Sequence, residues 1–68
     1  MELMVNGKKR DVADGATITA LLDELKINPL RVAVQLNLEI VKREQYERTA
    51  LKAGDRLEII TFMAGGGE

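Results

Sequence analysis

The sequence predicts an α+β fold in which one helix crosses a mixed β-sheet, in the element order ββαβββ. Short runs of alternating apolar residues surround a single Leu-rich stretch with helical spacing, and turn-forming residues separate these runs. One helix on one face of a sheet is the simplest arrangement that buries both apolar sets. We expect one domain from the 68 residues, with no room for both a core and an enclosed active site.

The composition excludes several kinds of chemistry. The chain has no Cys and no His, which excludes disulfides, thiolate chemistry, imidazole acid–base catalysis and the usual zinc sites. The net charge of −1 gives a weak field, so we expect neither nucleic acid nor membrane as a partner. No apolar run approaches transmembrane length, and residues 1–10 lack a signal-peptide core. These features are typical of a soluble, cytoplasmic protein that acts with partners.

The first two strands are predicted to form a hairpin. Residues 1–5 alternate between two faces, and the Asn6-Gly7 pair that follows is the strongest short hairpin signal, because both residues tolerate positive φ. A second strand over residues 8–13 then returns antiparallel to the first.

A two-residue turn would pair Val5 with Lys8 and Leu3 with Arg10. Both cations then lie on the apolar face, and we expect their stems to cover the edge of the core while the charges reach water. The second strand is therefore predicted to be an edge strand whose charges discourage aggregation.

The single helix has a start signal and a stop signal. Thr17 is a favourable N-cap, and Ala16 can pack against the helix as a hydrophobic staple. The apolar positions that follow share one helical stripe at i, i+3, i+4 and i+7: Ile18, Leu21, Leu22 and Leu25. Asn28-Pro29 is predicted to end the helix, because a residue before proline avoids the α region. Roughly ten residues of helix are too few to be stable without a sheet to cover.

The second half of the chain predicts three more strands. They are expected at residues 31–36, 40–41 and 57–62. Tight turns at residues 37–39 and 53–55 precede the last two strands. A charged segment at residues 42–51 contains Tyr46, which we expect to pack as a lid over the small core.

The last predicted strand leads directly into a glycine-rich terminus, residues 62–68. A frayed chain end is the ordinary interpretation of such a segment. However, glycine is also the residue that passes most easily through a narrow channel, because it has no side chain and few backbone restrictions. We expect residues 1–63 to form the folded domain and residues 64–68 to form a flexible tail.

Several of these features together resemble the ubiquitin-like β-grasp sulfur carriers of thiamine biosynthesis, the ThiS type. Residues 37–46 are similar to the Asn-x-x-(Ile/Val)-Val-x-Arg-x-x-aromatic stretch of that family. Residues 53–59 resemble its Gly-Asp-x-(Ile/Leu/Val) closing strand, and the Asn-Gly hairpin and the glycine terminus complete the resemblance. The resemblance covers the whole chain and implies a β-grasp fold.

The resemblance implies a protein cosubstrate and not an enzyme. An E1-like adenylating enzyme would use ATP to activate the C-terminal glycine, and a sulfurtransferase or cysteine desulfurase would supply sulfur to form a thiocarboxylate. Thiazole synthase would then accept that sulfur. Gly66 and Gly67 are the implied functional end, with Ala64 and Gly65 threading the channel. ATP and the sulfur donor would act through the partners, so we expect no cofactor bound directly, and we expect a monomer.

Glu68 departs from the family pattern, in which the chain ends on glycine. With Glu68 present, the Gly67 carboxyl is held in an amide bond and cannot be adenylated. Three explanations stay open: a peptidase removes Glu68, the residue is an artefact, or the chain is an inactive precursor or a different kind of module.

A docking surface is predicted beside the tail. In the implied fold the first and last strands are neighbours, so we expect Met4 to lie beside Ile60 and Phe62 on the open face of the sheet. If Leu57 and Ile59 face the helix, strand alternation directs the other two residues away from it. An apolar patch that contains an aromatic residue next to a reactive tail indicates protein docking.

Two alternatives differ from this reading in function. The same carrier chemistry could serve molybdopterin synthesis, a cysteine or methionine pathway, or protein conjugation. Alternatively, the chain is a non-carrier β-grasp interaction module with a frayed tail. We assign no catalytic residue and no metal ligand, because Asp23 and Glu24 simply occupy the polar face of the helix.

Overall fold

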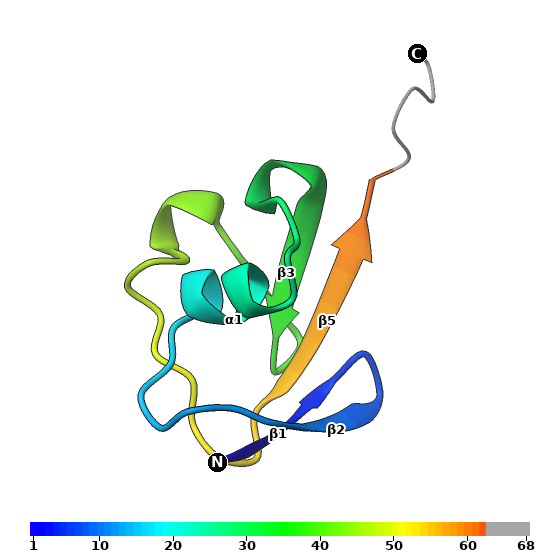
Figure 1. Cartoon of the computed structure of the whole chain (residues 1–68). Coiled ribbons are helices and arrows are strands. Elements are labelled where there is room, and N and C mark those ends of the chain that lie inside the picture. Colours follow the sequence, from blue (N-terminus) through cyan, green and yellow to red (C-terminus); the bar gives the residue numbers. More distant parts are fainter. Residues whose placement is uncertain (63–68) are drawn as a thin grey trace.

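The computed structural model describes residues 1–62, which form a five-stranded mixed sheet with one α-helix. Figure 1 shows the elements in the order that the sequence predicts, two strands, a helix and three strands. The bounds are β1 (Glu2–Val5), β2 (Lys8–Asp11), α1 (Ile18–Glu24), β3 (Val32–Leu36), β4 (Glu39–Val41) and β5 (Arg56–Thr61), with 3₁₀ turns η1 (Pro29–Arg31) and η2 (Arg43–Gln45). The order in the sheet is β2-β1-β5-β3-β4, and β1 and β5 are parallel. No helix in residues 1–62 is long and apolar enough to cross a membrane.

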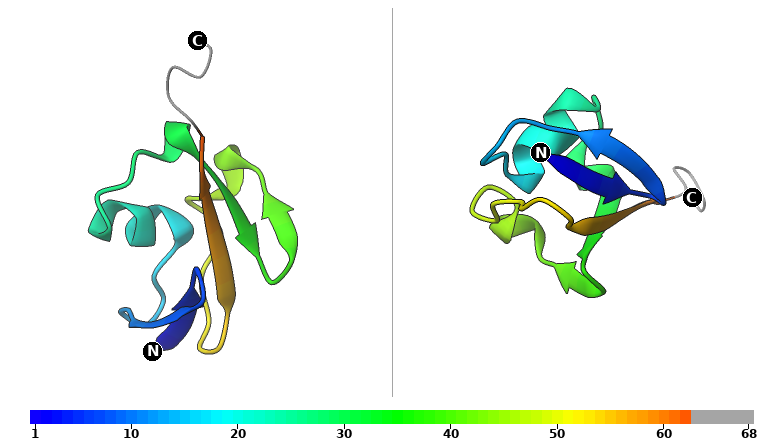
Figure 2. Two further views of the ribbon diagram at one scale, coloured as in Figure 1. Left: turned by 90° about the vertical axis from the view of Figure 1, so that its right-hand side faces the viewer. Right: turned by 90° about the horizontal axis from the view of Figure 1, so that it is seen from below.

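The core lies between α1 and one face of the sheet (Figure 2). Its buried side chains are Leu3, Val12, Ile18, Leu21, Leu22, Val32, Val34, Tyr46, Leu51, Leu57 and Ile59. Within the described residues, no polar or charged side chain is buried among them, Tyr46 apart. The Tyr46 side chain is 4% exposed, and its hydroxyl accepts a hydrogen bond from Val34 N at 3.2 Å. Tyr46 therefore packs within the core, and the predicted packing is confirmed.

The first hairpin has the predicted register. Val5 pairs with Lys8 and Leu3 pairs with Arg10, across a turn in which Asn6 has φ of 50°. Lys8 is exposed, while Arg10 is half-buried and its Nη2 lies 3.9 Å from a Glu24 carboxylate oxygen. As predicted, β2 is an edge strand, although it ends at residue 11 and not at residue 13.

The start of α1 is as predicted, because the Thr17 side chain accepts a hydrogen bond from Ala20 N at 3.1 Å. The predicted end is wrong, since the helix stops at Glu24 after seven residues. Lys26 adopts a positive φ of 60° and donates from its backbone N to Asp23 O at 3.0 Å. Ile27 N donates to the Leu22 carbonyl at 2.9 Å, which completes a Schellman motif.

The Asn28-Pro29 pair starts the next element and does not stop the helix. The Asn28 side chain accepts a hydrogen bond from Leu30 N at 2.9 Å, so it caps the N-terminus of η1. Proline fits the first position of such a turn, because its missing N–H would be unpaired there in any case. The turn leads the chain directly into β3.

Candidate docking site at the C-terminal end of β5

The candidate site is built on β5, the central strand of the sheet. Leu57 and Ile59 point into the core and are 1% and 8% exposed, whereas Ile60 and Phe62 are 50% and 52% exposed. The predicted alternation is confirmed, because successive side chains of a strand point to opposite faces. Figure 1 shows that the C-terminal end of β5 extends past the β1–β2 hairpin, while β3 stays paired with it up to Thr61.

Met4 does not lie beside this pair, and the prediction that it does is wrong. β1 runs parallel to β5 and places Met4 opposite Arg56, at the start of β5. Ile60 is four residues further along the strand, about 13 Å away at a rise of about 3.3 Å per residue. The neighbour of Ile60 is instead Ala33 in β3, so Met4 is remote from Phe62 as well.

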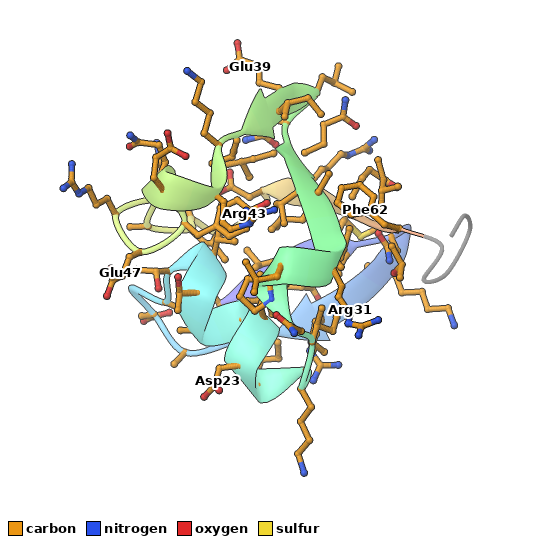
Figure 3. All side chains as sticks on the ribbon, turned by 90° about the horizontal axis from the view of Figure 1, so that it is seen from above. Asp23, Arg31, Glu39, Arg43, Glu47 and Phe62 are labelled. Atoms are coloured by element: carbon orange, nitrogen blue, oxygen red, sulfur yellow. The ribbon has the colours of Figure 1, made fainter. Side chains whose placement is uncertain are left out.

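We call Ile60, Phe62 and the half-buried Ala33 the apical patch. Phe62 N donates to the carbonyl of Arg31 at 2.9 Å, which extends the pairing between β3 and β5 by one residue. Figure 3 looks down on this end of the molecule and shows Phe62 beside the point where the described chain ends, with Arg31 close by. The apical patch is therefore a small apolar surface next to an exposed cation, at the base of the tail.

Asn6 anchors the middle of β5 to the first hairpin. Its backbone N donates to Leu57 O at 2.8 Å, and its side-chain Oδ1 accepts from Ile59 N at 2.7 Å. The side chain thus replaces the backbone carbonyl that a longer β1 would supply. Sequence reasoning identified Asn6 as a turn residue and missed this second role, for which the sequence carries no local signal.

Asn37 and Asp55 fix the start of β5. The Asn37 side chain accepts from Arg56 N and donates to an Asp55 carboxylate oxygen, both at 3.0 Å. The other Asp55 oxygen accepts from Lys52 N at 2.8 Å. Two predicted turns are therefore hydrogen-bonded to one another, and together they hold the strand that carries the tail.

The N-terminal ammonium lies in an ionic cluster. It donates to Val12 O at 2.7 Å, and carboxylate oxygens of Asp14 and Asp11 lie at 3.2 and 3.3 Å from it. The hydrogen bond with Asp14 contributes most to raising the pKa of this ammonium above 8.0, while desolvation acts in the opposite direction. This cluster ties the first residue to the loop that precedes α1.

Within residues 1–62, no group of three or more Asp or Glu side chains is placed to hold a metal ion. The predicted tail residues Ala64, Gly65, Gly66, Gly67 and Glu68 lie outside the described residues, so their roles stay predictions. The described residues provide a strand that β3 and Asn6 hold by hydrogen bonds, and an apolar patch at its C-terminal end.

The strand order and the single crossing helix define a ubiquitin-like β-grasp protein. A sequence model of the ThiS family matches residues 3–66, so the chain belongs to the ThiS family. The crystal structure of a thiamine biosynthesis protein (ThiS) from Geobacter metallireducens superposes with a TM-score of 0.84 at 42% identity. That match covers 97% of this chain and all of the other. The family and the fold that the sequence resembled are both confirmed.

The chain is also similar to a sulfur carrier protein and to two thiazole synthases. The sulfur carrier protein ThiS of Escherichia coli is 30% identical over 97% of this chain and 100% of its own length. A thiazole synthase of Paramagnetospirillum magneticum is 43% identical over all 68 residues, and one of Magnetococcus marinus is 33% identical over 97% of the chain. The chain spans only about a fifth of these two thiazole synthases, 21% and 20%.

Proposed function

We propose that this chain is a sulfur carrier of thiamine biosynthesis, whose C-terminal glycine is converted to a thiocarboxylate. The observation that carries the proposal is the match to the ThiS family over residues 3–66, which includes the first two glycines of the tail. The similarity to the E. coli sulfur carrier over its full length supports the same conclusion. The chain is then a substrate of other enzymes and not a catalyst.

The proposed chemistry acts on a glycine carboxylate, at Gly67 or Gly66. A carboxylate is a poor electrophile, so an E1-like enzyme transfers AMP from ATP to one carboxylate oxygen and releases pyrophosphate. The terminal sulfur of a persulfide on the sulfur donor then attacks the carbonyl carbon and displaces AMP, which gives an acyl disulfide. A thiol reduces this S–S bond, which releases the thiocarboxylate and leaves the thiol joined to the donor cysteine as a disulfide. No side chain of residues 1–62 is needed in these steps, because the reacting groups belong to the tail and to the enzyme. Gly65 and Ala64 occupy the channel that leads to the reacting carbon.

The proposed chemistry requires three partner proteins and takes place in one cell compartment. They are the adenylating enzyme, a sulfurtransferase or cysteine desulfurase that provides sulfur, and thiazole synthase, which accepts it. The two thiazole synthase relatives support the last partner, because a segment like this chain occurs within proteins of that name. The activation step consumes ATP, so we place it in the cytoplasm. The chain itself binds no cofactor in this scheme and acts as a monomer.

Glu68 determines which form of the chain is active. Adenylation needs a free glycine carboxylate, so we propose that a peptidase removes Glu68 and exposes Gly67. The test uses three forms: the full chain, a chain that ends at Gly67, and a chain that ends at Ala64. Each is incubated with an E1-like enzyme, ATP and a sulfur donor, and its intact mass is measured.

The expected result is exchange of one oxygen for sulfur in the chain that ends at Gly67, and in neither of the others. Modification of the chain that ends at Ala64 would show that the glycines are not needed. If the chain that ends at Gly67 and a chain that ends at Gly66 both stay unmodified with adenylating enzymes of carrier systems, the proposal is contradicted and a non-carrier interaction module is favoured.

A further inference from the structure

The strand β5 is covered unequally on its two sides. On one side β3 pairs with it along its whole length, from Leu57 opposite Leu36 to Thr61 opposite Val32. On the other side β1 pairs only with the first residues, Arg56 and Leu57. Figure 1 shows β5 extending past the β1–β2 hairpin toward the C-terminus.

The peptide groups of β5 alternate between these two sides. The carbonyl of Arg56 accepts a hydrogen bond from Asn37 N, and Phe62 N donates to the carbonyl of Arg31, so both ends of the strand bond toward the β3 side. Even-numbered residues of β5 therefore direct their N–H and C=O groups toward β3. Odd-numbered residues direct theirs toward β1, as the bond from Asn6 N to Leu57 O confirms.

Three backbone groups follow the last contact with the first hairpin. Ile59 N is paired with the Asn6 side chain, but Ile59 C=O, Thr61 N–H and Thr61 C=O point to the side where no strand lies within residues 1–62. Thr61 is exposed, so water can reach these groups. The segment Ile59–Thr61 is a short free edge with one donor and two acceptors, and it ends one residue before Phe62.

This edge lacks the protection that the other edges of the sheet have. Edge strands commonly carry charges or are very short, which prevents pairing with other chains. β2 has the charged sequence Lys-Lys-Arg-Asp, and β4 has only three residues and starts with Glu39. By contrast, residues 59–62 are Ile-Ile-Thr-Phe, an uncharged run with high β-propensity. An unprotected edge beside a functional tail indicates that the edge is used.

We propose that the free edge of β5, residues 59–61, pairs with an extended segment of the adenylating enzyme, which adds a strand to the sheet. Strand addition gives affinity through main-chain hydrogen bonds and specificity through alternate side chains. The proposal rests on the proposed function, because the adenylating enzyme encloses the tail, so its wall lies next to the strand that precedes the tail.

The geometry limits the length and the chemistry of the added strand. Ile59 N already donates to the Asn6 side chain, so the added strand can pair only with the groups that follow it, from Ile59 C=O to Thr61 C=O. At the turn of the first hairpin the added strand must turn away from β5. On the outer face, its side chains meet Ile60 and Phe62, which are half-exposed. The segment is therefore a short one with apolar residues on the outer face.

Residue-resolved amide hydrogen exchange provides the test. In the free chain, we expect Thr61 N–H to exchange faster than Ile60 N–H and Phe62 N–H, which face β3. When the adenylating enzyme is added without ATP, the Thr61 amide is expected to become protected, on the order of tenfold or more. The chain used throughout ends at Gly67, and the same chain is then assayed for thiocarboxylate formation with ATP and a sulfur donor.

A matched pair of variants distinguishes the contribution of the Thr61 backbone N–H to binding from that of its side chain. Thr61→Pro removes the N–H and blocks pairing at this edge, whereas Thr61→Val keeps the N–H and the branched shape. We expect the proline variant to bind the enzyme about tenfold or more weakly and the valine variant to bind normally. A semisynthetic chain with the α-hydroxy analogue of threonine at position 61 removes only the N–H and is expected to weaken binding too. It separates lost pairing from a proline-induced change of fold.

Normal thiocarboxylate formation together with an unprotected Thr61 amide would overturn this proposal and leave the proposed function intact. If the enzyme binds and protects the Thr61 amide but no thiocarboxylate forms, the result would support strand pairing at residues 59–61 and contradict the proposed carrier function. Protection of Thr61 in the free chain that rises with its concentration would show that a second copy occupies the edge, and would overturn the proposal.

Discussion

Truncation of Phe62 should weaken binding to the adenylating enzyme with little loss of stability. A phenylalanine side chain can bury about 200 Å², and the Phe62 side chain is 52% exposed in the free chain. About 100 Å² therefore stays available for a partner, which corresponds to about 2.5 kcal/mol at about 25 cal/mol per Å². For Phe62→Ser, we expect the dissociation constant to rise by up to roughly 70-fold.

The assay is calorimetric binding of the chain to the adenylating enzyme, with thermal unfolding of each variant as a check on the fold. Leu38→Ala is the matched control, because Leu38 is an even more exposed apolar residue, at 87%, in the turn between β3 and β4. That turn lies beside Arg56, at the opposite end of β5 from the tail. Equal effects of the two substitutions, or an unchanged affinity for Phe62→Ser, would refute docking through the apical patch.

Three further substitutions or conditions test how the fold supports the site. Lys26→Gly should relieve the strain of the positive φ at this position and raise the free energy of unfolding by up to about 1 kcal/mol. The melting temperature should then be about 4–8 °C higher. Lys26→Ala keeps the strain and should show no such gain. Asn6→Gly keeps a residue that tolerates positive φ but removes the acceptor for Ile59 N, so chemical denaturation should show a loss of about 1–3 kcal/mol, and an unchanged stability would contradict the anchoring role. The raised pKa of the N-terminal ammonium stabilises the fold fully below pH 8.0, and this contribution is lost as the pH rises through the higher folded value. The melting temperature should therefore fall above pH 8.0, and less so in Asp14→Asn, whereas an identical pH dependence of the two proteins would contradict the assignment.

Much of the fold could be predicted because its signals are local. The Asn6-Gly7 turn fixed the register of the first hairpin, and alternation placed Ile60 and Phe62 on the outer face. The hairpin register depends on residues that are close in the sequence. The face on which a strand side chain lies depends only on the two-residue alternation of the strand.

The features that could not be predicted depend on long-range register or on unfavourable local conformations. Alternation fixes the face of Met4 but not how far β1 reaches along β5, so the predicted patch was wrong at that residue. The end of α1 was missed because Lys26 is not a residue that favours positive φ, and core packing of Ile27 stabilises it there. The Asn6 side chain bonds to Ile59, 53 residues away, and no local pattern reveals such a pair.

The proposed role of the tail is tested most directly by the intact mass of the untagged protein, isolated from its native cells while they synthesise thiamine. We expect a chain that has lost Glu68 and has one oxygen replaced by sulfur at Gly67. A chain that keeps Glu68 and carries no sulfur under those conditions would contradict the carrier function.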